Sequence, residues 1–171
     1  MKNLSNKLIF VAIAVVFIVG CNPQYPTKLQ QDNLDKYLSF WNTGNFEGIE
    51  NVLDADYEYI ASPNYEPQKG IEALKKEISE TRTSFPDFKV VVEEKFANKD
   101  RVAVLWSITA TRADNDTIKL NGKGISIIHF KDNKIKDEWL ANNNLLWLKQ
   151  MGYSITPPPP PPPPLPDKQV K

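Results

Sequence analysis

Four segments with the alternating pattern of β-strands follow one another between residues 88 and 142. The segments are FKVVVEEKF, RVAVLWSITATR, TIKLNGKGISIIHF and IKDEWLAN, and short turn sequences such as ANKD, DND and KDNK separate them. Strands joined by such short turns pair antiparallel, because a parallel pair needs a long crossover connection. This order excludes a doubly wound parallel sheet, in which strands and helices alternate.

Helical patterns precede these strands. The apolar residues from Leu34 to Trp41 recur at i, i+3, i+4 and i+7, and Gly44 in NTGN is placed to end that helix with a left-handed cap. Two shorter helical patterns follow, separated by a strand at residues 57–61. We therefore expect residues 28–153 to form one α+β domain, a cone in which a curved antiparallel sheet wraps around the long first helix. Such a cone has an open mouth where a pocket can form.

The N-terminus has the composition of a secretory signal. MKNLSNK supplies lysines, and LIFVAIAVVFIV is an uncharged apolar run, shorter than the roughly 20 residues that span a bilayer. The run ends in IVGC, which resembles the lipobox of bacterial lipoproteins, and Cys21 is the only cysteine. We expect residues 1–20 to be a signal peptide and residues 21–27 a linker acylated at Cys21. The alternative is a free buried thiol behind an ordinary signal peptide.

Acyl chains on Cys21 would hold the domain on a membrane of the bacterial cell envelope, as a periplasmic or outer-membrane lipoprotein. At the other end, residues 154–171 include PPPPPPPPLP, which favours polyproline II and cannot join a sheet or helix. We interpret this segment as a disordered, solvated tail. Docking to an aromatic-lined groove of a partner is the alternative.

Composition bears on the classes of ligand. The formal net charge is zero, so nothing indicates a nucleic-acid partner. The chain has a single histidine and a single cysteine, without the spacing of metal ligands. No glycine-rich phosphate loop follows a strand, and no serine sits in a nucleophile elbow. We therefore predict neither a metal site nor a cofactor.

Several segments in order resemble the SnoaL-like polyketide cyclase family of the nuclear transport factor 2-like superfamily. They are FWNTGNFEGIENVLDADYEYIASP, GIEALKKEISETRTSFPDFKVVVEE, DRVAVLWSITAT, GISIIHFKDNKIKDEW and the closing QMG. The resemblance runs from about residue 34 to residue 153, nearly the whole domain. It implies an α+β cone with a small-molecule pocket, in a family that includes cyclases, isomerases and hydrolases. It also implies a possible homodimer through the open face of the sheet.

Two departures from the family pattern bear on catalysis. Cyclases of this family have an acid/base aspartate nine residues before the final glycine, and that count gives Asn143. An amide holds the shape of the site but does not exchange a proton near neutral pH. Members also often carry a longer, histidine-containing connection where this chain has the short hairpin TATRADNDTIKL.

Two other residues are candidates for proton transfer if the domain is an enzyme. His129 shares a strand face with Ile125 and Ile127, and the alternative is a packed or half-exposed histidine. Alternation from Trp139 places Asp137 on the inner face of the last strand, where a paired or rim carboxylate is the alternative to a catalytic acid.

Aromatic residues from different elements favour binding of a small, largely apolar molecule, with a plain aromatic core as the alternative. Trp147, on the closing helix, is a candidate for a subunit contact. Two hypotheses remain open: an envelope-anchored binding module, and a lipoprotein enzyme of the cyclase or isomerase type that uses displaced groups. The predicted ligand-binding residues are Trp41, Tyr57, Tyr59, Phe85, Trp106 and Trp139.

Overall fold

The computed structural model of the chain describes residues 26–61, 66–154 and 156–161. The predicted signal peptide and Cys21 lie outside these residues, as does most of the proline-rich tail; the described prolines of the tail are exposed and have no regular secondary structure. None of the helices in the described part of the chain is both long and apolar enough to cross a membrane. The elements in chain order are α2 (Lys28–Thr43), α3 (Ile49–Val52), β1 (Leu53–Ile60), β2 (Gln68–Lys69), α4 (Ile71–Ser84), β3 (Lys89–Asn98), β4 (Arg101–Arg112), β5 (Asn115–Lys131), β6 (Lys134–Asn142) and α5 (Asn144–Gln150).

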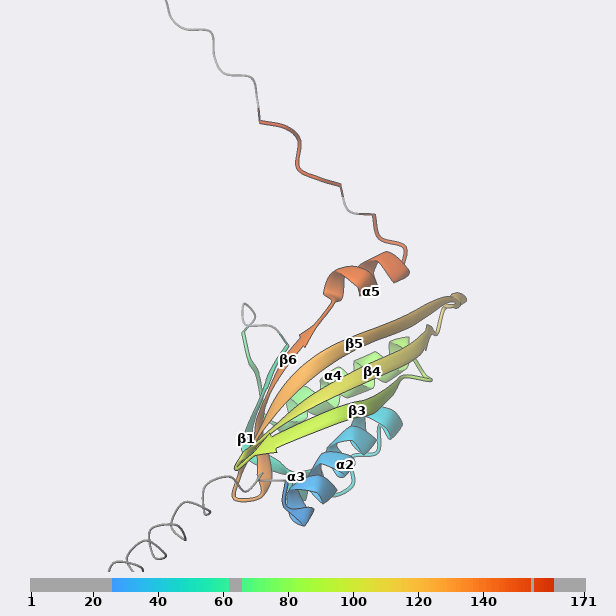
Figure 1. Cartoon of the computed structure of the whole chain (residues 1–171). Helices are drawn as coiled ribbons and strands as arrows, with labels where there is room; N and C mark the ends of the chain where they lie inside the picture. Colours follow the sequence, from blue (N-terminus) through green and yellow to red (C-terminus); the bar gives the residue numbers. More distant parts are fainter. Residues whose placement is uncertain (1–25, 62–65, 155, 162–171) are drawn as a thin grey trace, which may run out of the picture.

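The strands form one six-stranded sheet in the order β2-β1-β6-β5-β4-β3. Strands β3 to β6 make the consecutive antiparallel pairs that the short turns predict. The sheet is long, twisted and curved, and α2 and α4 lie on one of its faces (Figure 1). The α+β prediction is confirmed, with one correction: the sheet is mixed, because β1 runs parallel to β6. That pairing is possible because a helix and four strands separate the two strands in the chain.

Helix α2 is fixed at both ends by interactions that the sequence encodes. Thr27 and Gln30 form a capping box at its start. At its end Gly44 has φ 69°, as predicted, and its N–H bonds to the Phe40 carbonyl. The guanidinium group of Arg82, in α4, packs against Gly44 and donates to the Asn42 carbonyl at 2.8 Å. These contacts hold the C-terminal turn of α2 against α4.

Asn42 connects the same turn to the sheet. Its side-chain amide donates to the Val90 carbonyl at 3.0 Å, and its oxygen accepts from the Val90 N–H at 2.7 Å. The amide thus mimics a neighbouring strand on β3, the edge strand of the sheet. These two hydrogen bonds tie the C-terminal turn of α2 to β3.

A bulge in β6 decides which residues face the helices. His129 pairs with Asp137, and the next residue of β5, Phe130, pairs with Ile135. Lys136 is therefore an extra residue, and the alternation of β6 changes phase there. Ile135 is fully buried on one side of the bulge and Glu138 is buried on the other.

The placement of Asp137 and Trp139 on the inner face, which assumed unbroken alternation, is wrong. Glu138, Leu140 and Asn142 face inward in their place.

Candidate functional site

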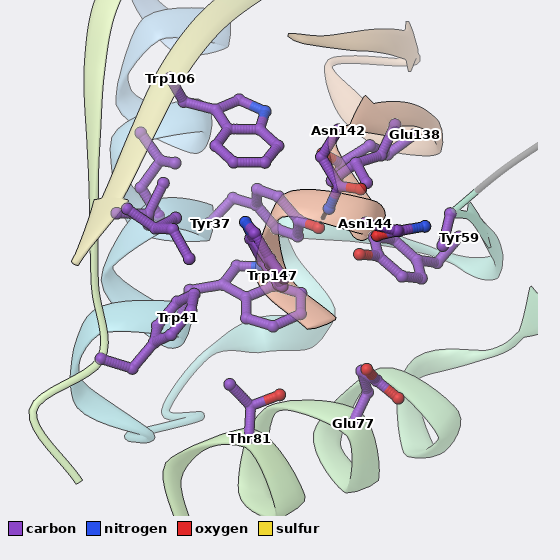
Figure 2. A pocket seen from close by; sticks show the side chains of 16 residues that line it. Tyr37, Trp41, Tyr59, Glu77, Thr81, Trp106, Glu138, Asn142, Asn144 and Trp147 are labelled. Carbon is purple, nitrogen blue, oxygen red and sulfur yellow. Dashed lines mark hydrogen bonds between the residues drawn. The ribbon is translucent and has the colours of Figure 1, made fainter. Parts of the chain in front are cut away.

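A cavity of about 230 Å³ lies between the helices and the inner face of the sheet (Figure 2). Its wall comes from α2, α4 and α5 and from strands β1, β3, β4 and β6, so residues far apart in the sequence meet there. Most of the wall is apolar or aromatic, which suits a small organic molecule. The lining residues are Tyr37, Leu38, Trp41, Tyr59, Ala61, Glu77, Thr81, Phe88, Val90, Trp106, Ile108, Glu138, Leu140, Asn142, Asn144 and Trp147.

A buried carboxyl group forms the polar end of the cavity. Glu138 is only 5% exposed, and its Oε2 accepts a hydrogen bond from the Tyr37 hydroxyl. The Tyr57 hydroxyl lies 2.9 Å from that of Tyr37 and 3.5 Å from the same carboxyl oxygen. Burial raises the pKa of Glu138, although hydrogen bonds from Ser126 and the two tyrosines oppose the shift. The structure thus holds a buried carboxyl group, with its pKa raised, against a hydrogen-bonded tyrosine pair.

Two glycines of β5 make room for two tryptophans. A Cβ atom on Gly124 would lie 2.2 Å from the Trp106 ring, and one on Gly122 would lie 2.4 Å from Trp147 Nε1. Trp106 Nε1 donates to the Ser126 hydroxyl at 2.8 Å, so this ring is held in place at its polar end. The two indole rings can therefore approach the backbone of β5 closely, because Gly122 and Gly124 have no side chains.

Among the described residues, two buried side-chain atoms have no hydrogen-bond partner, Asn142 Oδ1 and Trp147 Nε1. Both residues line the cavity. Buried polar atoms are nearly always paired, and an unpaired one in a cavity wall is a place where a bound molecule can supply the missing partner. The Trp147 nitrogen lies against Gly122, whereas Asn142 follows Glu138 along the inner face of β6 (Figure 2).

The structure brings some of the predicted binding residues together and separates others. Trp41, Tyr59 and Trp106 lie on the cavity wall, and the rings of Trp41 and Tyr59 are 6.0 Å apart. Tyr57 is fully buried behind the wall, where it supports Tyr37. Phe85, at the C-terminal cap of α4, packs against the core without lining the cavity.

Trp139 is 55% exposed on the opposite face of the sheet, which follows from the bulge at Lys136. Val91, Ile125 and Ile127 are also exposed on the strands of the sheet. The homodimer that the resemblance implies stays a prediction, and this apolar surface is where such a contact would form.

The two candidates for displaced proton transfer lie away from the cavity. His129 Nδ1 is 3.2 Å from an Asp137 carboxylate oxygen, and its Nε2 is 2.8 Å from one of Asp100. His129 does share a face with Ile125 and Ile127, as alternation predicts, but that face is the outer one. Neither His129 nor Asp137 can therefore reach a molecule in the cavity.

Asn143 is also outside the cavity wall. It is the N-cap of α5, and its Oδ1 accepts from the Leu146 N–H at 3.0 Å. The side chain is exposed, and the neighbouring amides of Asn142 and Asn144 line the cavity in its place. The three consecutive asparagines thus divide between a helix cap and the cavity.

We expect Asn143→Asp to change the free energy of unfolding by less than about 0.5 kcal/mol, equally at pH 5 and pH 8, because aspartate is an equally good N-cap. Asn143→Ala should fray α5 and cost its amides about 1 kcal/mol of protection in hydrogen exchange, since the cap is lost. A variant with aspartate that loses stability toward pH 8 would instead place residue 143 in a buried site.

Sequence reasoning missed several cavity residues. Glu138 and Asn142 were hidden by the bulge, which leaves no signature in the alternation. Tyr37 belongs to the predicted apolar stripe of α2, but a stripe does not tell which residues contact an empty space. Trp147 was considered for a subunit contact, whereas it lines the cavity; the glycines Gly122 and Gly124 were the available signal.

Within the described residues, no group of three or more His, Cys, Asp or Glu side chains is placed to hold a metal.

The architecture is that of the nuclear transport factor 2-like α+β proteins. A protein assigned as a SnoaL-like polyketide cyclase from Jannaschia sp. CCS1 has a TM-score of 0.67 at 13% identity, over 80% of this chain and 100% of that one. A nuclear transport factor 2-like protein of unknown function from Burkholderia pseudomallei K96243 has a TM-score of 0.64 at 10% identity, over 74% and 100%. At these identities the similarity concerns the fold alone.

Residues 31–151 match the family model described as SnoaL-like polyketide cyclase, and the chain belongs to that family. A protein assigned as a polyketide cyclase from Bacillus cereus ATCC 10987 is 27% identical, with a TM-score of 0.64 over 72% of this chain and 80% of that one. No curated protein is significantly similar to the chain.

Proposed function

We propose that this chain is an envelope-anchored lipoprotein whose SnoaL-like domain binds a small, largely apolar molecule, without the family's acid/base aspartate. The observation that carries the binding proposal is the cavity of about 230 Å³. Aromatic side chains of α2, β1, β4 and α5 form much of its wall. Gly122 and Gly124 of β5 leave room for two of them, Trp147 and Trp106. Rigid aromatic walls with few polar groups are typical of sites for small organic ligands.

The test of binding is to isolate the full chain from its own membranes in mild detergent and to identify co-purifying molecules by native mass spectrometry. Thr81 lines the cavity, so Thr81→Trp should fill it and displace the molecule. Thr83, on the same helix, is exposed, and Thr83→Trp is the matched control that should retain the molecule. A bound mass that is equal in both variants, or absent from the wild type, would contradict the proposal.

Anchoring is tested separately. The motive is the IVGC junction, so we expect Cys21→Ser to abolish acylation and to leave an uncleaved or mislocalised precursor. Metabolic incorporation of labelled palmitate measures this, with Asn22→Ser as the neighbouring control that keeps the label. Equal incorporation in the Cys21 variant and the wild type would exclude this anchor.

The second candidate function is an enzyme of the cyclase or isomerase type. Of the proposed displaced groups, His129 and Asp137 lie on the outer face, whereas Glu138 reaches the cavity with a pKa that burial raises. A carboxyl group whose pKa is raised by burial is suited to act as a general acid. If the domain is an enzyme, its pH-rate profile should show one titrating group that Glu138→Gln removes.

A further inference from the structure

The charged groups in the cavity wall are all acidic. Of the 16 lining residues, Glu77 and Glu138 are the ones with acidic side chains, and none of the 16 is lysine, arginine or histidine. Glu138 stands on the sheet and Glu77 on α4, on opposite sides of the hollow (Figure 2). An anionic ligand would meet two carboxyl groups and no compensating cation among the lining residues.

Tyr59 shows that both carboxyl groups act on the same region. Burial, and then the negative charges of Glu138 and Glu77, raise the pKa of its hydroxyl. Tyr59 is 7% exposed and lies on the wall between these two residues (Figure 2). A positive charge placed near Tyr59 would therefore interact favourably with both carboxylates at once.

An unpaired hydrogen-bond acceptor points to the same chemistry. Asn142 Oδ1 is buried in the wall and receives no hydrogen bond from the described residues. With the two carboxyl groups it forms a set of acceptors, and acceptors require donors from the ligand. The other unpaired atom, the donor Trp147 Nε1, lies against the backbone of Gly122. It therefore adds no donor to the group of acceptors that a ligand would meet.

Aromatic faces complete the site. Trp41 and Tyr59 are inclined at 44° with ring centres 6.0 Å apart, and Trp106 forms the opposite part of the wall (Figure 2). The negative face of an aromatic ring attracts an ammonium group, and several rings around one cation are a recurring way to bind amines. The same rings exclude water, which strengthens the interaction with a carboxylate.

We propose that the ligand of this cavity is an organic cation: a small, mostly apolar molecule that carries a protonated amine. This inference rests on the proposed small-molecule binding. Glu138 and Glu77 supply the counter-charge of the amine from the two sides of the hollow, and the apolar frame packs on Trp41 and Trp106. A neutral ligand with one donor would satisfy Asn142 but leave the carboxyl groups without a counter-charge.

The test compares probes of one shape and different charge by calorimetry on the full-length chain in detergent, with an empty-micelle blank. 1-Naphthylmethylamine, 1-naphthylmethanol and 1-naphthoic acid form one set, and benzylamine, benzyl alcohol and benzoic acid form a smaller one. We expect the amine of the better-fitting set to bind about tenfold more tightly than its alcohol, or about 1.4 kcal/mol, and the carboxylate not to bind.

Variants assign the preference to the site. Glu77→Gln and Glu138→Gln should each reduce the ratio of amine to alcohol affinity, and Glu94→Gln, at an exposed position of β3, should leave it unchanged. If Glu138→Gln fails to fold, Glu77→Gln, at a less buried residue, still tests whether the preference for the amine arises in this cavity.

Equal binding of amine and alcohol, or a preference that neither cavity variant changes, would contradict the proposal of a cationic ligand. The proposal that the cavity binds a small molecule would be unaffected. Failure of every probe in both sets overturns the pocket itself, and with it the proposed function.

Discussion

Gly124→Val is expected to lower the free energy of unfolding by about 3 kcal/mol. A Cβ atom at this position would lie 2.2 Å from Trp106 Cζ2 and 2.8 Å from the Ala141 carbonyl oxygen. Overpacking of this kind typically costs about 1–3 kcal/mol. We expect the upper end of that range, because one of the two neighbours is backbone of the paired strand β6. Urea denaturation measures the loss of unfolding free energy.

The neighbouring glycine provides a graded control. Gly122→Ala meets only the side chain of Trp147, which belongs to the peripheral helix α5 and can move outward. It should cost less than Gly124→Ala. Because Trp106 is the main obstacle at Gly124, the double variant Gly124→Ala/Trp106→Leu should be more stable than the sum of the single losses. Strict additivity, or a Gly124→Ala variant as stable as the wild type, would contradict this packing.

The sheet was predictable because its evidence is local. Short turns between alternating segments specify antiparallel neighbours, and the order β6-β5-β4-β3 follows directly from them. The parallel contact of β1 with β6 was not predictable in this way, since it joins Tyr59 to Glu138 across a large part of the chain. The two-residue strand β2 also left no pattern, because Gln68 and Lys69 are both exposed.

The site was less predictable because it depends on the phase of one strand. Residues Ile135, Asp137 and Trp139 share a face only if β6 is regular, and the bulge at Lys136 sends Asp137 and Trp139 outward. Nothing in IKDEWLAN distinguishes a regular strand from a bulged one. Asp137 and Glu138 are adjacent, so an acidic residue faces inward in either case. The predicted aromatic wall was less sensitive: Trp41 and Trp106 lie on a regular helix and a regular inner-facing stretch of β4.

The residue count transferred from the family gives Asn143, which lies outside the cavity wall. The chain turns from β6 into α5 at this residue, and the helix needs a side-chain cap there. The asparagine that caps points outward, so the adjacent residues Asn142 and Asn144 face the cavity. Sequence spacing alone does not locate such a change of direction, because strand and helix place successive side chains differently.

Glu138→Gln is expected to alter the pH dependence of stability more than any other conservative change in the domain. The pKa of Glu138 in the folded state is raised, chiefly by burial, whereas the pKa of a glutamate in the unfolded chain is about 4.3. Between these two values the unfolded chain has released the proton and the folded chain has kept it, so wild-type stability falls as pH rises. Each unit of difference is worth about 1.4 kcal/mol. Glutamine removes this slope, and the variant should therefore gain on the wild type from pH 4 to pH 8.

The difference between the two unfolding profiles isolates Glu138, because other groups contribute equally to both. Tyr37, Tyr57 and Tyr59, which face the carboxyl group, have pKa values raised above 10 and stay neutral over this range. Glu94→Gln, on an exposed part of β3, should give a profile parallel to the wild type. Parallel profiles for Glu138→Gln and wild type would mean that water reaches the carboxyl group. A bound cation stabilises the carboxylate, so a saturating amine should reduce the slope of the wild type and leave that of Glu138→Gln unchanged.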